Sequence, residues 1–217
     1  MHALRAKHKI YFSDKTFLIS MCVGILLLLG SFVVNFYAGT YASEKAGNPV
    51  QDIILSNIPV FNVSVFFVYG PAILWIFVTI LCIHEPKRFP LVIKSIALFI
   101  LIRSFFITLT HIGPFPDQTY INYLSHDFIG KFTFGGDLFF SAHTGLPFLM
   151  ALVFWKDMKL RLFFIAAAVF FGVIVLLGHL HYSIDVASAF FITYTIYHLA
   201  LRMFKKDAEL FNEGLKQ

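Results

Sequence analysis

Charged side chains are scarce in this sequence of 217 residues, where Asp, Glu, Lys and Arg together make up 13% and hydrophobic residues 59%. A water-soluble domain could not cover its surface with so few polar groups. The composition therefore excludes an ordinary soluble fold and predicts an integral membrane protein, in keeping with a mean hydropathy of +0.79. Apolar runs recur along the whole chain without an intervening polar block, so we expect one membrane domain over residues 1–217.

Cysteine is also rare, and the two cysteines, Cys22 and Cys82, lie inside apolar runs far from any CxxC or metal-ligand spacing. This indicates small buried hydrophobic residues. The sequence has neither a phosphate-cradling glycine loop nor a carboxylate cluster, so we expect no cofactor and no catalytic metal. The formal net charge of +5 does not indicate a nucleic-acid partner, because the basic residues cluster at the ends of apolar runs.

Six apolar runs predict an all-α integral membrane fold, a six-transmembrane-helix bundle. An α-helix rises about 1.5 Å per residue, so about 20 apolar residues cross a hydrocarbon layer about 30 Å thick. The predicted spans are Phe17 to Ala38, Val60 to Ile83, Pro90 to Thr110, Leu138 to Trp155, Leu162 to Leu177 and Ile184 to Met203. The first run lacks the cleavage site of a signal peptide and is expected to stay as an anchor.

The distribution of Lys and Arg predicts the orientation of this bundle. Thirteen of these residues fall on the side of the N-terminus, against Lys45 and Lys131 on the other side. The positive-inside rule then places both termini in the cytoplasm. Residues 1–16 form a cytoplasmic N-terminal segment, residues 17–203 the six-helix core, and residues 204–217 a charged, solvated, helical cytoplasmic tail.

Two polar segments stand at the outer edge of the predicted bundle, HYSID at residues 181–185 and a segment that ends at His143. Ionisable groups are costly beside hydrocarbon and usually face a site or a water-filled cavity. His181 and Asp185 are four residues apart, so their side chains can meet across one helical turn. The carboxylate would fix the tautomer of the imidazole, which favours His181 as a nucleophile and His143 as a proton donor and acceptor.

Further polar residues are candidates for binding a substrate at the same site. Arg103 in the third predicted span and the hydroxyl of Ser141 could stabilise charge on a phosphoryl group. Asp137 either orients this pocket or caps the fourth helix, and the cap is the simpler interpretation. Tyr182, inside the second histidine segment, completes the set of substrate-binding candidates.

Other interpretations of the histidines stay open at this point. A single membrane histidine more often forms a helix–helix hydrogen bond than it catalyses a reaction, whereas two with a partnered aspartate favour catalysis. His179 and His181 could belong to a metal site, although only one carboxylate accompanies them. His111 and His126 are candidates for lining the pocket, and no role is assigned to them.

The two predicted outer loops, residues 39–59 and 111–136, are long, and we expect them to select the substrate. The second indicates either an interfacial aromatic belt or a cation–π cradle for an ammonium headgroup. Its aromatic residues are Phe115, Tyr120, Tyr123, Phe128, Phe132 and Phe134. A six-span transporter is the alternative from another class, but the ionisable groups gather at one face and not at the midplane, which favours an enzyme.

The two histidine segments resemble motifs of the type 2 phosphatidic acid phosphatase superfamily. Ser141-Ala142-His143 is similar to the family's Ser-Gly-His segment, with alanine in place of glycine. The hydrolase branch usually carries an arginine at the position of Val175 and a Lys-x6-Arg-Pro segment, and this sequence has neither. Residues 136–144 (GDLFFSAHT) and 181–186 (HYSIDV) instead resemble the sphingomyelin synthase branch, as does, more weakly, the segment NPVQD at residues 48–52.

This resemblance implies an enzyme that moves a phospho-headgroup from a donor phospholipid to a lipid hydroxyl, of the ceramide or diacylglycerol type, at the outer leaflet. It also implies the roles of the residues: His181, oriented by Asp185, attacks the donor phosphorus, and His143 protonates the leaving group and then deprotonates the acceptor. Water in place of the acceptor would give a lipid phosphate phosphatase or phospholipase, the second candidate from the same superfamily.

The expected partners are therefore a donor and an acceptor membrane lipid. The sequence leaves open whether the chain forms a homo-oligomer. Its brevity favours the bacterial inner membrane, with the active site facing the periplasm, over a Golgi or plasma membrane location in a eukaryote.

Overall fold

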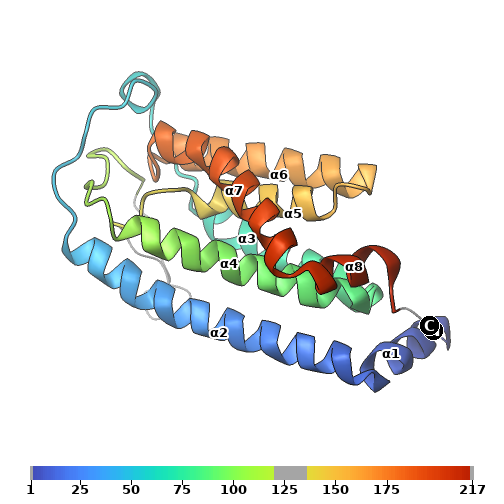
Figure 1. Ribbon diagram of the computed structural model, residues 1–217. Helices are drawn as coiled ribbons and strands as arrows, with labels where there is room; N and C mark the ends of the chain where they lie inside the picture. The colour runs from blue at the N-terminus through green and yellow to red at the C-terminus, as the bar shows by residue number, and fades with distance from the viewer. Residues whose placement is uncertain (1, 120–135, 216–217) are drawn as a thin grey trace.

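The computed structural model describes residues 2–119 and 136–215, and within these ranges the chain is helical without any strand (Figure 1). The α-helices are α1 His2–Ser13, α2 Lys15–Glu44, α3 Ser64–His84, α4 Phe89–Ile107, α5 Ala142–Val153, α6 Met158–Leu177, α7 Ser183–Met203 and α8 Lys205–Glu213. Two single-turn 3₁₀ helices, η1 Leu55–Asn57 and η2 Pro86–Arg88, lie in the connections. The predicted all-α class is confirmed for these ranges.

Five helices of the described chain, α2, α3, α4 with η2, α6 and α7, are long and apolar enough to cross a membrane. They coincide with five of the six predicted spans and indicate an integral membrane protein. Helices α2 and α6 begin a few residues before the predicted apolar runs, because Asp14 and Asp157 cap them by accepting hydrogen bonds from backbone N–H groups. Hydropathy marks the apolar run and not the cap.

The predicted fourth span, Leu138 to Trp155, is shorter than expected. Helix α5 has only 12 residues, Ala142–Val153, because residues 136–141 are not helical. It still reaches the far end of the bundle, where Phe154 lies beneath the guanidinium of Arg88. The predicted six crossings are therefore five full-length helices and one short, mostly buried helix.

Helices α4 and α5 form the centre of the bundle. Helix α4 packs against α2 and α7, and α5 packs against α6 and α7. Their buried faces join one apolar core, with Phe99, Leu149 and Phe164 fully enclosed. Helices α2 and α3 keep many apolar side chains exposed, as expected for surfaces that face lipid.

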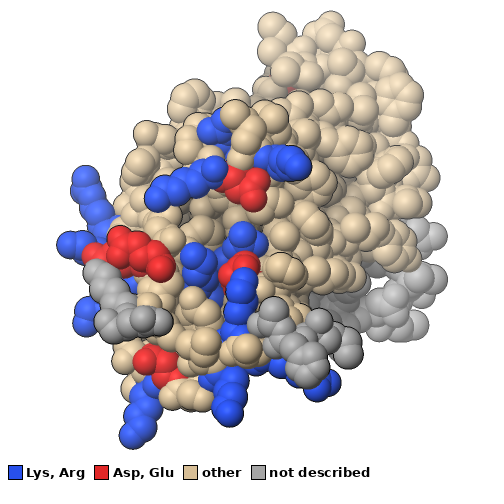
Figure 2. Space-filling view, turned by 90° about the vertical axis from the view of Figure 1, so that its right-hand side faces the viewer, with Lys and Arg blue, Asp and Glu red and all other residues tan. Residues whose placement is uncertain are grey.

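Lys and Arg gather at one end of the molecule, around α1, α8 and the turns between α3 and α4 and between α5 and α6 (Figure 2). Both ends of the described chain lie here, since a side chain at Gly214 would approach the hydroxyl of Tyr11. We call this the basic end. The predicted cytoplasmic location of both termini depends on this clustering of Lys and Arg.

The predicted tail forms the helix α8, but this helix is docked on the bundle and is not simply solvated. Asp207 of α8 is buried and accepts a hydrogen bond of 2.6 Å from Lys94 of α4. Lys94 also donates to Ser20 of α2 at 2.7 Å. The charged composition of the tail therefore does not reveal that one of its carboxylates forms a buried ion pair with a residue 113 positions away in the sequence.

Candidate active site

The start of α7 brings together the two residues of the second histidine segment. Asp185 is the third residue of the helix, and its carboxylate accepts a hydrogen bond of 2.9 Å from the backbone N–H of Tyr182. The same oxygen lies 3.4 Å from Nδ1 of His181, and both side chains are buried. The predicted contact across one turn is present. Within the described residues Nε2 of His181 makes no hydrogen bond, which leaves this nitrogen for another ligand.

The start of α5 is fixed to the start of α7. Ser141 caps α5, and its hydroxyl is 3.4 Å from the backbone N–H of Thr144. The backbone N–H of Ser141 donates to the carbonyl of Asp185 at 3.1 Å. This bond places His143, two residues further on, beside the His181 pair. The Ser141 hydroxyl itself is fully buried in the cap.

His143 lies in the first turn of α5 against the first turn of α3. Its ring stacks on Phe67 with the centroids 4.0 Å apart, and its Nε2 is 3.2 Å from the Phe67 carbonyl. A carbonyl only accepts, so this contact puts the proton on Nε2 and leaves Nδ1 free to exchange one. The bond from Ser141 to Asp185 and the bond from Arg103 to Phe140 hold His143, His181 and Arg103 at the same end of the bundle.

Arg103 holds the non-helical segment that precedes α5. Its Nε donates to the Phe140 carbonyl at 2.8 Å, and its Nη1 lies 3.0 Å from the Asp137 carboxylate. Its Nη2 donates to the Asp137 carbonyl. These bonds satisfy backbone oxygens that a helix would otherwise pair, which allows irregular backbone inside a membrane bundle. A guanidinium has five N–H donors, and the described residues use three of them, so two stay available to a ligand.

Asp137 does not cap α5, because Ser141 does. The cap interpretation of Asp137 was therefore wrong, and the alternative, that Asp137 orients the pocket, fits its ion pair with Arg103.

The hydroxyl of Tyr182 is not free for a substrate. It donates to the Gly113 carbonyl at 2.8 Å and accepts from the backbone N–H of Val50 at 3.2 Å, and the side chain is only 2% exposed. Tyr182 was predicted to bind substrate, but here its hydroxyl ties both outer connections to the start of α7. The tyrosine therefore supports the neighbouring His181 from outside the bundle.

Asp52 of the first outer connection was missed as a site residue. One carboxylate oxygen accepts a 2.7 Å hydrogen bond from the backbone N–H of Ser183, the first residue of α7. The other accepts from the N–H groups of Ile54 and Leu55 at 2.8 and 3.1 Å. Burial raises the pKa of Asp52, but the hydrogen bonds from Ser183 and Leu55 outweigh it and hold the pKa below its ordinary value. The signal in the sequence was a carboxylate in a long loop that is poor in charge.

The remaining histidines do not join the site in the same way. His179 is buried against Phe115 with a ring-centroid distance of 5.2 Å, and neither ring nitrogen has a partner among the described residues. His111, in the connection after α4, packs against Tyr41 of α2. His126 lies outside the described residues.

A metal site at His179 and His181 is not supported, since residues 2–119 and 136–215 hold no group of three or more His, Cys, Asp or Glu placed for an ion. The aromatic cradle stays a prediction, because of its members only Phe115 is described. Those outside the described residues are Tyr120, Tyr123, Phe128, Phe132 and Phe134.

The fold and the site together define a class: an α-helical membrane protein with two histidines, an arginine and two aspartates at one end of the bundle. These residues belong to α4, α5, α7 and the segments before α5 and α7. The family model "PAP2 superfamily C-terminal" matches residues 135–202, which include α5, α6, α7 up to its last residue but one, and both histidine segments. This match supports the PAP2 superfamily, and it suggests phosphoryl transfer or hydrolysis on lipid phosphates. No curated protein and no solved structure matches the chain.

Proposed function

We propose that this protein is a membrane lipid phosphotransferase, which moves a phospho-headgroup from a donor phospholipid to the hydroxyl of a ceramide or diacylglycerol. The observation that carries the proposal is the buried His181–Asp185 pair, 3.4 Å apart, beside His143 and Arg103. A carboxylate behind an imidazole orients the ring and stabilises the charge that it gains as a nucleophile. The proposal needs no metal and no cofactor.

The first step transfers the phospho-headgroup to the enzyme. Nε2 of His181 attacks the donor phosphorus, and the bond between phosphorus and the glycerol oxygen of the donor breaks. His143 gives a proton to that oxygen, so that diacylglycerol leaves and a phosphohistidine carrying the headgroup remains. Asp185 balances the positive charge on the His181 ring.

The second step reverses the first with a different alcohol. The hydroxyl of the acceptor lipid attacks the phosphorus, His143 removes its proton, and the bond between phosphorus and Nε2 breaks. The two N–H donors of Arg103 that the described residues leave unpaired stabilise the charge on the phosphoryl oxygens in both steps of this proposal.

Transfer is proposed ahead of hydrolysis because of Val175. The hydrolase branch that the sequence resembles usually has an arginine at this position. Here Val175 is fully buried in an apolar cluster with Phe67 and Val186, next to the His143 ring. The site therefore has one arginine fewer to hold the three charged oxygens of a free phosphate monoester, which supports a phosphodiester donor.

The position of the site supports the outer leaflet as the place of the reaction. Lys and Arg gather at the basic end (Figure 2), and the starts of α5 and α7 lie at the opposite end of the bundle (Figure 1). By the positive-inside rule the site then faces the periplasm of a bacterial inner membrane, or the lumenal or extracellular side in a eukaryote.

The experiment that tests the proposal is lipid mass spectrometry on the purified full chain in liposomes. Labelled ceramide or diacylglycerol is supplied with a mixture of unlabelled phospholipids as donors. We expect labelled acceptor that carries a phospho-headgroup, together with diacylglycerol from the donor. Free phosphate or a released phospho-headgroup as the only product would identify a phosphatase or phospholipase. Turnover of neither kind, with transport of a solute instead, would favour the transporter.

A further inference from the structure

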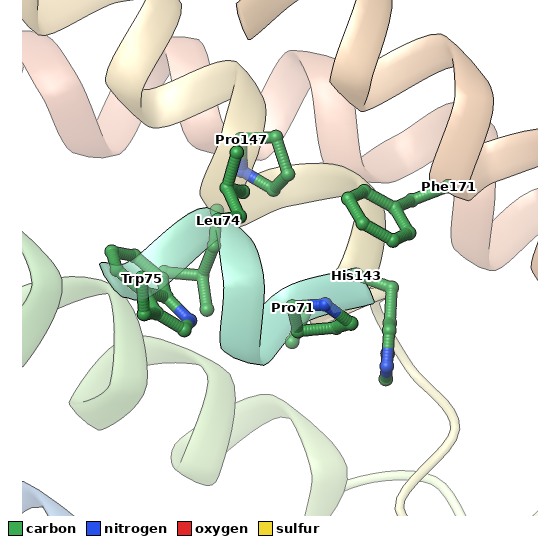
Figure 3. A pocket seen from close by; sticks show the side chains of 8 residues that line it. Pro71, Leu74, Trp75, His143, Pro147 and Phe171 are labelled. Carbon is green, nitrogen blue, oxygen red and sulfur yellow. The ribbon is translucent and has the colours of Figure 1, made fainter. Parts of the chain in front are cut away.

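A half-open apolar pocket lies beside His143, between α3, α5 and α6 (Figure 3). Pro71, Leu74 and Trp75 of α3 form one wall. Leu146 of α5 is also part of the lining. His143 is the ionisable residue among the side chains that line it. A ligand in this pocket would therefore be apolar, with its polar part next to the His143 ring.

We propose that this pocket binds the first segment of an acyl chain of the donor phospholipid, below the phosphate that His181 attacks. The inference rests on the proposed function, since it names the part of the substrate that the site recognises. It adds a subsite that determines which acyl chains of the donor phospholipid the enzyme accepts.

The direction of the pocket fits a lipid. Phe67 in the first turn of α3 stacks on His143 in the first turn of α5, so both helices lead away from the site into the bundle. Pro71 to Trp75 and His143 to Pro147 each cover five residues, and the four steps between the first and the last give a rise of about 6 Å. If the phosphate of a phospholipid is held near His143, its acyl chain therefore runs along the apolar residues of the pocket, deeper into the membrane.

The pocket lies beside a close contact between α3 and α6. Helix α3 touches α6 closely at Gly70, where a Cβ atom would come within 2.5 Å of the Phe171 ring. Beside this contact Pro71 and Leu74 face the pocket, while Ile73 is 67% exposed on the lipid-facing side. The pocket is therefore next to the surface from which a lipid chain would enter, and its lining is of the apolar kind that binds such a chain.

The test is photo-crosslinking of the full chain in phosphatidylcholine liposomes, with a phospholipid that carries a diazirine on a carbon near its headgroup. We expect adducts on Trp75 or Leu146, and competition by unlabelled phospholipid. Leu146→Phe fills the pocket and should reduce these adducts by about tenfold, the usual scale for one misfit in an apolar pocket. Ile76→Phe, on the exposed face of α3 outside the pocket, is the matched control and should leave them unchanged. Adducts that are spread evenly over lipid-facing residues, or that persist in Leu146→Phe, would overturn the proposal.

A second variant separates a filled pocket from a misfolded protein. Leu146→Ala enlarges the pocket and should shift crosslinking toward phospholipids with branched chains, the opposite of the effect of Leu146→Phe. Crosslinking requires no turnover. Specific adducts on a protein without transfer activity would therefore support the acyl-chain subsite and contradict the proposed phosphotransferase activity. Lipid transfer without adducts in the pocket would reject the subsite and keep the phosphotransferase.

Discussion

Helix α4 carries two buried basic residues, and each ends in an ion pair at a different end of the molecule. Lys94, 7% exposed, binds Asp207 and Ser20 at the basic end. Arg103, 6% exposed, binds Asp137 and backbone carbonyls at the other end. The two sites have similar burial and the same kind of charges, so burial alone does not say which of them is functional.

The partners make the difference. At the basic end the ammonium of Lys94 on α4 lies 2.6 Å from the carboxylate of Asp207 on α8 and 2.7 Å from the hydroxyl of Ser20 on α2, with the Phe204 ring 5.6 Å away. These contacts hold α8 against the bundle. Arg103 instead holds the irregular backbone before α5, and two of its N–H donors have no partner among the described residues. A buried charge with unused hydrogen-bonding capacity beside titratable groups indicates a site, and a buried charge whose partners only join helices to one another indicates a structural link.

The largest effect on this contrast is expected from Asp185→Asn. The variant leaves a neutral group behind His181, and we expect the rate of lipid transfer to fall by about 10⁴-fold, as for an aspartate that orients a catalytic histidine. The measurement is kcat in liposomes. Asp157→Asn, which alters the cap of α6 at the basic end, is the control and should keep its rate. Equal rates in the two variants would remove Asp185 from the mechanism.

Lys94→Met should affect stability and not catalysis. It leaves the buried carboxylate of Asp207 without its partner, so we expect the free energy of unfolding to drop by about 3–5 kcal/mol. Thermal unfolding in detergent measures this loss, and Lys94→Met combined with Asp207→Leu should recover much of it. The folded fraction should turn over lipid at the normal rate. A change in kcat at full folding would mean that the two ends are coupled.

Arg103→Lys should show the reverse behaviour. The ammonium of lysine keeps the charge but loses the planar set of donors, so we expect kcat to fall by about 10²-fold or more. Lys94→Arg at the basic end is the matched exchange, and its effect on kcat should be within about twofold. A loss of stability without a loss of kcat in Arg103→Lys would make Arg103 a structural residue like Lys94.

The smallest expected effect is the loss of folding stability at low pH that depends on Asp52. Because its folded-state pKa lies below the ordinary value of 3.8, the stability it contributes is complete above that value and is lost as the pH falls through the folded-state pKa. Asp52→Asn removes this dependence and leaves one N–H group of Ser183 or Leu55 unpaired, at a cost of about 1 kcal/mol. Melting temperatures between pH 3 and 6 compare the two proteins. Identical curves for both would show that Asp52 does not hold the start of α7.

Hydropathy and spacing were sufficient to predict the long helices and the contact between His181 and Asp185, since both depend on residues close in sequence. The rest depends on distant partners. The length of α5 is set by Ser141 and by the bonds from Arg103 to residues before it, which no local pattern reveals. The same holds for Tyr182, whose hydroxyl binds loops about 70 and 130 residues away, and for the pairing of Lys94 with Asp207.

The central claim is that His181 is the nucleophile, and trapping the intermediate tests it most directly. The purified chain is mixed with a phospholipid whose phosphate is isotopically labelled, without acceptor, and is quenched at high pH, where phosphohistidine survives. Peptide mass spectrometry should find the labelled phospho-headgroup on His181 and nowhere else, and His181→Ala should lose both the label and the transfer of lipid. Label on another residue, or undiminished transfer by His181→Ala, would contradict the account.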